Sequence, residues 1–119
     1  MPEPKTYVGS CHCGQVRYEV TTDLEQVLEC NCSICSRAGY LLSFVAADRF
    51  KLLAGADKLT DYQFNKKNIH HQFCKTCGVR SFGHGTGPGG AAMYAINVRC
   101  LEGVDPRALS VKRVDGKSL

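Results

Sequence analysis

Cysteine is the residue type whose spacing carries most of the chemistry in this sequence. The chain has 119 residues and eight cysteines, seven of which fall into three short clusters. The clusters are Cys11-x-Cys13, Cys30-x-Cys32-x-x-Cys35 and Cys74-x-x-Cys77. Cysteines at such spacings are typical of tetrahedral zinc sites. Seven sulfurs predict two zinc ions: one closed by four sulfurs, and one held by three with a fourth position for water or substrate.

The closed site is expected to combine the first and third clusters, Cys11, Cys13, Cys74 and Cys77. Each of these pairs is followed directly by a glycine, Gly14 or Gly78, which tolerates the positive φ of a tight turn. A zinc ion bound there would join the beginning of the chain to its middle and add folding free energy. We expect a structural role for this site.

The cluster at Cys30, Cys32 and Cys35 can direct three sulfurs to one metal from a single loop, and these residues are the predicted catalytic ligands. If Ser33 begins a helical turn, its backbone N–H groups would stabilise the Cys32 and Cys35 thiolates. Arg37, two residues further on, either pairs with a substrate carboxylate or is a solvated surface arginine.

Cys100 is the eighth cysteine and the main alternative ligand. It is in phase with Tyr94, Ile96 and Val98, which predicts a place on the buried face of a strand, where a free thiol behaves as a small hydrophobic group. If Cys100 instead closed the second site, both zinc ions would be structural.

The four histidines and the glycine-rich segment 83–90 give weaker signals. His12 lies between two cysteines and is expected to point away from their metal. His71 is predicted to be a core histidine and His70 to point outward, while the pattern around His84 predicts nothing. The segment 83–90 lacks the Gly-Lys-Ser/Thr ending of a phosphate-binding loop, so we expect a hairpin loop.

Composition narrows the class of protein. A hydrophobic content of 44% supports one folded domain over residues 1–119. Seven thiolates and two Zn²⁺ ions would lower the formal charge from +4 to +1. The sequence has no stripe of Lys and Arg residues of the kind that would predict nucleic-acid binding. With no apolar signal segment and no membrane-length apolar run, we expect a cytoplasmic protein with reduced thiols.

Most of the chain alternates between apolar and polar residues, as half-buried strands do. Val16, Tyr18 and Val20 share one face, and the run 41–47 is apolar throughout, which predicts a strand buried on both sides. Further strands are expected around 60–64, 69–73, 94–98 and 109–111. The single helical turn near Ser33 is the only helix expected, so the fold class is all-β.

Four segments of this sequence closely resemble the glutathione-dependent formaldehyde-activating family, whose domain centromere protein V shares. They are Gly9-Ser10-Cys11-His12-Cys13-Gly14, Cys30-Asn31-Cys32-Ser33-Ile34-Cys35, Phe73-Cys74-Lys75-Thr76-Cys77-Gly78 and Ile96-Asn97-Val98-Arg99-Cys100-Leu101. The resemblance extends over residues 7–105. It implies several small coiled antiparallel sheets similar to the mammalian suppressor-of-Sec fold, with a structural zinc on the first and third cysteine clusters and a catalytic zinc on the second.

The activity that the resemblance implies is that of a carbon–sulfur lyase, which interconverts glutathione plus formaldehyde and S-hydroxymethylglutathione. Three thiolates make a zinc ion a muted Lewis acid, which suits a thiol substrate that must remain nucleophilic. The alternative is a non-catalytic, zinc-stapled interaction module. A methionine sulfoxide reductase is a third reading, but the chain lacks that family's second Cys-x-x-Cys pair and has no tryptophan.

Overall fold

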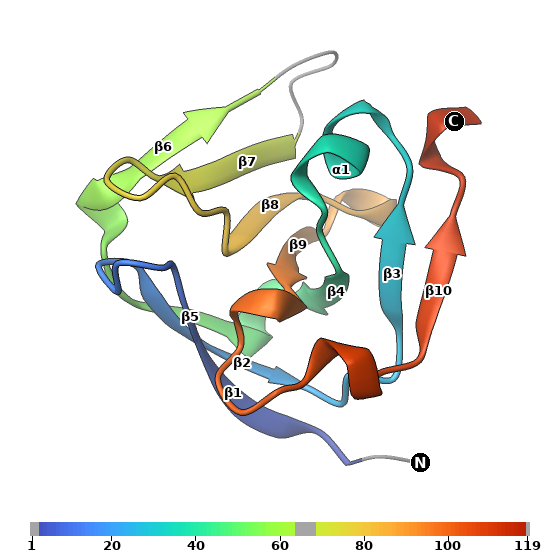
Figure 1. The fold of residues 1–119 in the computed structure, drawn as a ribbon, viewed down its shortest axis with the longest axis horizontal. Coiled ribbons are helices and arrows are strands. Elements are labelled where there is room, and N and C mark those ends of the chain that lie inside the picture. Colours follow the sequence, from blue (N-terminus) through green and yellow to red (C-terminus); the bar gives the residue numbers. More distant parts are fainter. Residues whose placement is uncertain (1–2, 64–68, 119) are drawn as a thin grey trace.

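The computed structural model describes residues 3–63 and 69–118, of which strands make up the largest part (Figure 1). By residue count the described part of the chain is mostly β. The strands are β1 (Lys5–Ser10), β2 (Arg17–Thr22), β3 (Val27–Cys30), β4 (Leu42–Ala46), β5 (Phe50–Ala54), β6 (Leu59–Tyr62), β7 (Ile69–Cys74), β8 (Phe82–Thr86), β9 (Ala92–Asn97) and β10 (Val111–Val114).

The described residues contain one α-helix, α1 (Ser33–Ala38), which is the helical turn that the sequence predicted. It ends at Gly39, whose φ of 73° lets its N–H bond the carbonyl of Cys35. The other helical segments are short 3₁₀ turns, η1 (Ala47–Arg49), η2 (Ala56–Lys58), η3 (Pro88–Gly90), η4 (Val98–Cys100), η5 (Pro106–Ala108) and η6 (Gly116–Ser118). None of the described helices is long and apolar enough to cross a membrane.

The strands form two sheets, where the sequence predicted several small ones. One sheet has the order β1-β2-β5, and the other has seven strands in the order β10-β3-β4-β9-β8-β7-β6. All neighbours pair antiparallel except β10 and β3, which are parallel from Val111 opposite Val27 to Val114 opposite Cys30. The expectation of purely antiparallel sheets is therefore wrong at this pair. The likeness to the suppressor-of-Sec fold stays a prediction.

The parallel pair follows from the path of the chain after β9. Leu101 forms an isolated antiparallel bridge with Gly9, and the N–H of Glu102 bonds the carbonyl of Val8, so this segment runs back along β1. The chain then turns through η5 and enters β10 from the end at which β3 begins (Figure 1). The final strand accordingly covers 111–114, later than the expected 109–111.

The core lies between the two sheets and is centred on Tyr18. Val16, Tyr18 and Val20 are fully buried, which confirms the predicted face. The Tyr18 ring packs against those of Phe50 and Phe82, with centroids 5.2 and 5.4 Å away. Its hydroxyl donates a hydrogen bond to the carbonyl of Ser81 across 2.9 Å, so the one polar atom of this large side chain is satisfied.

The prediction that 41–47 is buried on both sides is wrong for the second half of β4. Leu42, Ser43 and Val45 are buried, but Phe44 is 49% exposed and Ala46 is exposed. The face of the large sheet that carries Leu42 and Phe44 points away from the core. The strand predicted at 60–64 appears as β6, and its last expected residue, Phe64, lies outside the described residues.

Candidate metal centres and the adjoining cavity

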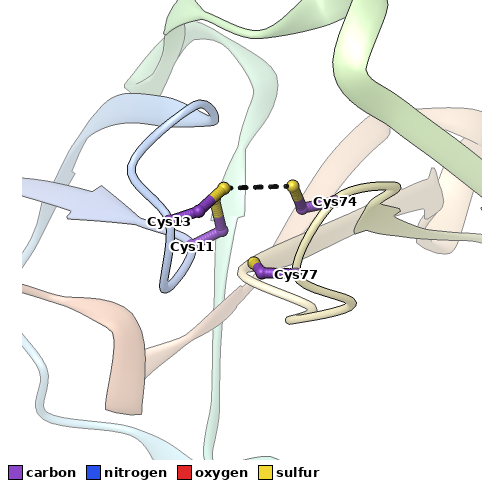
Figure 2. Close-up of side chains that lie close together, drawn as sticks. All are labelled: Cys11, Cys13, Cys74 and Cys77. Carbon is purple, nitrogen blue, oxygen red and sulfur yellow. Dashed lines mark hydrogen bonds between the residues drawn. The ribbon is translucent and has the colours of Figure 1, made fainter.

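The first and third cysteine clusters meet as predicted from their spacing. The sulfurs of Cys11, Cys13, Cys74 and Cys77 all lie within 4.8 Å of one another. Figure 2 shows that Cys11 and Cys13 come from the turn between β1 and β2, whereas Cys74 ends β7 and Cys77 lies in the turn that follows it. The cluster therefore connects the three-stranded sheet to the seven-stranded one.

The spacing and chemistry of these four sulfurs fit a tetrahedral metal ion. The Cys13 sulfur is 3.6 Å from that of Cys11 and 3.6 Å from that of Cys74. A tetrahedral zinc with bonds of about 2.3 Å would separate its sulfurs by about 3.8 Å. This group could hold a metal ion.

The electrostatic environment of these four sulfurs also favours a bound cation. Although burial opposes it, backbone N–H groups including that of Val79 lower the pKa of Cys77 to about 6. The pKa of Cys13 rises to about 11 despite a hydrogen bond from the N–H of Gln15, because burial and the neighbouring sulfurs disfavour another negative charge. A bound cation would remove this repulsion and allow all four sulfurs to be thiolates.

The second cluster brings the other three predicted sulfurs together. Cys30 ends β3, Cys32 is the N-cap residue of α1, and Cys35 lies within the helix, with all three sulfurs within 4.8 Å. No fourth Cys, His, Asp or Glu in 3–63 or 69–118 joins them. This group could also hold a metal ion, and its protein ligands number three.

The beginning of α1 acts on these sulfurs unequally. Burial disfavours the Cys32 thiolate, but backbone N–H groups of Cys35 and Ile34 donate to its sulfur and lower its pKa overall. Burial raises the pKa of Cys35, and the neighbouring sulfurs of Cys32 and Cys30 add to the effect. The expected stabilisation by the helical turn thus acts on the Cys32 thiolate and not on that of Cys35.

An apolar cavity of about 370 Å³ adjoins the three-cysteine cluster. One wall is the face of the large sheet that points away from the core, and the other contains α1 and Tyr40. Small residues on that sheet face, Gly83 and Ala95, leave the space open. The cavity is lined by Leu28, Cys30, Cys32, Ile34, Cys35, Tyr40, Leu42, Phe44, Ile69, His71, Phe82, Gly83, Ala95, Asn97 and Val114.

Two of the lining side chains are suited to proton transfer or hydrogen bonding. Burial lowers the pKa of His71, and the positive charge of Arg80 adds to the effect, so the imidazole is neutral near pH 7. Burial raises the pKa of Tyr40, although the guanidinium of Arg80 offsets part of the rise, so the phenol keeps its proton. His71 is half-buried, as expected for a core histidine, but it faces the cavity.

The C-terminal segment shapes this site, and sequence reasoning missed it. Val114 of β10 lines the cavity, and the next residue, Asp115, accepts a hydrogen bond of 2.9 Å from the side-chain amide of Asn31. Gly116 packs directly on the sulfur of Cys30, where a Cβ atom would overlap it. The only available signal was a glycine two residues beyond the strand, and it gave no indication that it packs on Cys30.

Arg37 does not line the cavity. It lies on the exposed side of α1, where its Nη1 donates to the carbonyl of Ser33 across 2.8 Å. It borders a separate groove of about 590 Å³ together with Tyr62 and Arg80. Arg80 was not singled out from the sequence, because nothing in the local pattern separates it from an ordinary surface arginine.

Cys100 belongs to neither cysteine cluster. The prediction that Cys100 lies on the buried face of a strand is wrong, because β9 ends at Asn97 and Cys100 lies in η4. There the Asn97 side chain accepts a hydrogen bond from the N–H of Arg99 and turns the chain out of the strand. Burial nevertheless raises the pKa of Cys100 to about 11, so it remains a thiol.

No histidine of the described residues joins either group of sulfurs. His12 is exposed, which agrees with the expected direction. His70 is not simply turned outward: its ring lies 2.7 Å from a carboxylate oxygen of Asp61 and stacks on His84 with centroids 4.4 Å apart. The hairpin loop expected over 83–90 is confirmed only in part, because residues 83–86 belong to β8 and the turn to β9 follows them.

Comparisons with known proteins agree with this geometry. The family described as "Glutathione-dependent formaldehyde-activating enzyme" matches residues 6–112. A crystal structure of a Rhodobacter sphaeroides protein is similar to the chain, with 35% sequence identity and a TM-score of 0.80. The similarity covers 90% of this chain and 99% of that one.

Proposed function

Because the chain belongs to the glutathione-dependent formaldehyde-activating family, we propose that it is a zinc-dependent carbon–sulfur lyase. Its reaction would interconvert glutathione plus formaldehyde and S-hydroxymethylglutathione. The observation that carries this proposal is the cluster of three sulfurs, without a fourth protein ligand among the described residues, at the wall of an apolar cavity. Its eight unbridged cysteines suit a reducing compartment such as the cytoplasm.

The two cysteine clusters would have different roles. Cys11, Cys13, Cys74 and Cys77 would hold a structural zinc, since four sulfurs complete a tetrahedron and join the two sheets. Cys30, Cys32 and Cys35 would hold the catalytic zinc and leave one position for the substrate sulfur. A zinc ion there would lower the pKa of a substrate thiol and keep its thiolate at a defined place.

The side chains of the cavity supply the rest of the chemistry. His71 is neutral near pH 7 and can accept the proton that the thiol loses. The sulfur electron pair then forms a C–S bond to the carbon of formaldehyde, while the C=O π pair moves to oxygen, which takes up the proton that His71 accepted. Tyr40 retains its proton and can donate a hydrogen bond to that oxygen. The reverse direction breaks the same C–S bond, and no electrons are gained or lost.

The apolar lining favours this reaction in both directions. Formaldehyde is largely hydrated in water. The apolar lining formed by Leu42, Phe44 and Ala95 has few groups that would hold water beside the sulfurs. Exclusion of water also strengthens the electrostatic effect of Tyr40 and His71 on the reacting atoms.

Cobalt substitution tests the proposal, because each added sulfur ligand strengthens the charge-transfer absorption. Glutathione should raise this absorption and S-methylglutathione should not. Formaldehyde exchange should accelerate over the same range of glutathione concentration, and Cys35→Ser should abolish both effects. Cys100→Ala, which changes a cysteine outside both clusters, is the matched control. A spectrum that saturating glutathione leaves unchanged would overturn the thiolate mechanism and favour the interaction module.

A further inference from the structure

Arg80 places its guanidinium group close to the proposed site. Its Nη1 is buried and has no hydrogen-bond partner within the described part of the chain. The guanidinium carbon lies 5.7 Å from the ring centroid of Tyr62 and 5.2 Å from that of Phe73, so aromatic rings hold the side chain in place. A buried guanidinium nitrogen without a partner is costly, which points to a ligand atom that completes it.

The position of Arg80 is fixed from its backbone as well. The side-chain amide of Asn97, a residue that lines the cavity, donates to the carbonyl of Arg80 across 2.9 Å. The guanidinium of Arg80 also lowers the pKa of Tyr40, at the opposite wall of the same cavity, through a side-chain hydrogen bond and through its charge. The guanidinium is therefore held beside the reacting region by groups that themselves belong to it.

A second arginine faces the same groove. Arg37 and Arg80 both line the 590 Å³ groove, whose other lining residues are Ser33, Ile34, Ala38 and Tyr62. None of these is acidic, and neither arginine forms an ion pair in 3–63 or 69–118. The groove thus has two positive charges and no counter-charge among its lining residues, which suits an anionic ligand.

The groove and the apolar cavity are adjacent, because Ile34 of α1 lines both. We propose that Arg37 and Arg80 form a carboxylate-binding subsite for the thiol substrate, which lies across Ile34. Its sulfur would reach the cluster of Cys30, Cys32 and Cys35, and its carboxylate would reach the two guanidinium groups. This inference rests on the proposed function and specifies the substrate class as peptide-like thiols whose carboxylate is several bonds away from the sulfur.

S-methylglutathione tests the subsite separately from the metal chemistry, because it keeps both carboxylates but has no free thiol. Binding of this compound and of its diethyl ester can be followed by calorimetry and by the NMR signal of the Arg80 Nε–H. The acid should bind about tenfold or more tightly than the ester, as charge-assisted hydrogen bonds predict. It should shift the Arg80 signal, and the ester should not.

Three variants make the experiment decisive. Arg37→Gln and Arg80→Lys should each reduce the preference for the acid about fivefold or more, whereas Arg107→Gln, an exposed arginine outside the groove, should leave it unchanged. Arg37 is exposed, so its variant remains informative even if Arg80→Lys fails to fold. Equal binding of acid and ester, or an unchanged preference in Arg37→Gln, would overturn the subsite. Loss of the cobalt–glutathione signal alone would instead overturn the proposed chemistry.

Discussion

Gly116→Ala should disturb the three-cysteine site from outside its ligands. A Cβ atom at residue 116 would overlap the Cys30 sulfur and lie 3.4 Å from the Cβ of Cys32. Gly116 is not among the glycines with positive φ, so the alanine backbone itself is unstrained. Relieving the overlap requires a shift of about 1 Å, since non-bonded heavy atoms pack at about 3.5–4 Å. Zinc–sulfur bonds tolerate a change in length of only about 0.2 Å.

The expected result is a fall in metal affinity of the three-cysteine site of about 10–100-fold, the usual effect of disturbing groups that touch a ligand. Competition with a chelator, followed by cobalt absorption, measures it, and the four-cysteine site provides an internal reference that should not change. Ser118→Ala is the matched control, because its hydroxyl donates to Asp115 in the same segment. If Gly116→Ala binds the metal as tightly as the parent does, the contact with Cys30 does not position that ligand.

Three further predictions concern the roles of individual residues. Cys77→Ser should lower the free energy of unfolding, measured in urea, by about 4 kcal/mol, because the four-cysteine site closes a loop of 61 residues between Cys13 and Cys74. Cys32→Ser should have nearly the same free energy of unfolding as the parent. Equal losses in the two variants would contradict the division of roles. Cys100→Ala should retain the parent's metal content and cost about 1 kcal/mol, and the loss of one metal equivalent would make it a ligand. Because the pKa of His71 is lowered, its base form persists at pH values below the ordinary 6.5. At constant metal content the reaction rate should therefore fall only as the pH drops further. The His71→Gln variant should react about 100-fold more slowly and lose this pH dependence, and an unchanged pH–rate profile in the variant would exclude His71 as the base.

Local features of the fold could be predicted because they depend on neighbouring residues. Alternation identified the buried face of Val16, Tyr18 and Val20, and Ser33 correctly marked the beginning of the single α-helix. The division of seven cysteines into four and three followed from spacing, since each short cluster can direct its sulfurs to one centre only. What these sulfurs bind remains a prediction.

Features that depend on distant segments could not be predicted from these patterns. The pairing of β10 with β3 joins residues more than 80 positions apart, and nothing in Val111–Val114 specifies a parallel neighbour. Burial of Phe44 was overestimated because hydrophobicity does not show whether a sheet face adjoins a core or a cavity. Cys100 was placed in a strand because Asn97, which ends β9, also fits the alternation.

The position of β10 at the edge of the large sheet has a consequence for aggregation. An edge strand presents unpaired N–H and C=O groups to other molecules. β10 is only four residues long, and its central residues, Lys112 and Arg113, are exposed cations. Two copies that paired through this edge would bring like charges together, which opposes strand addition. The strand that carries Val114 to the cavity is thus also protected from recruitment into an intermolecular sheet.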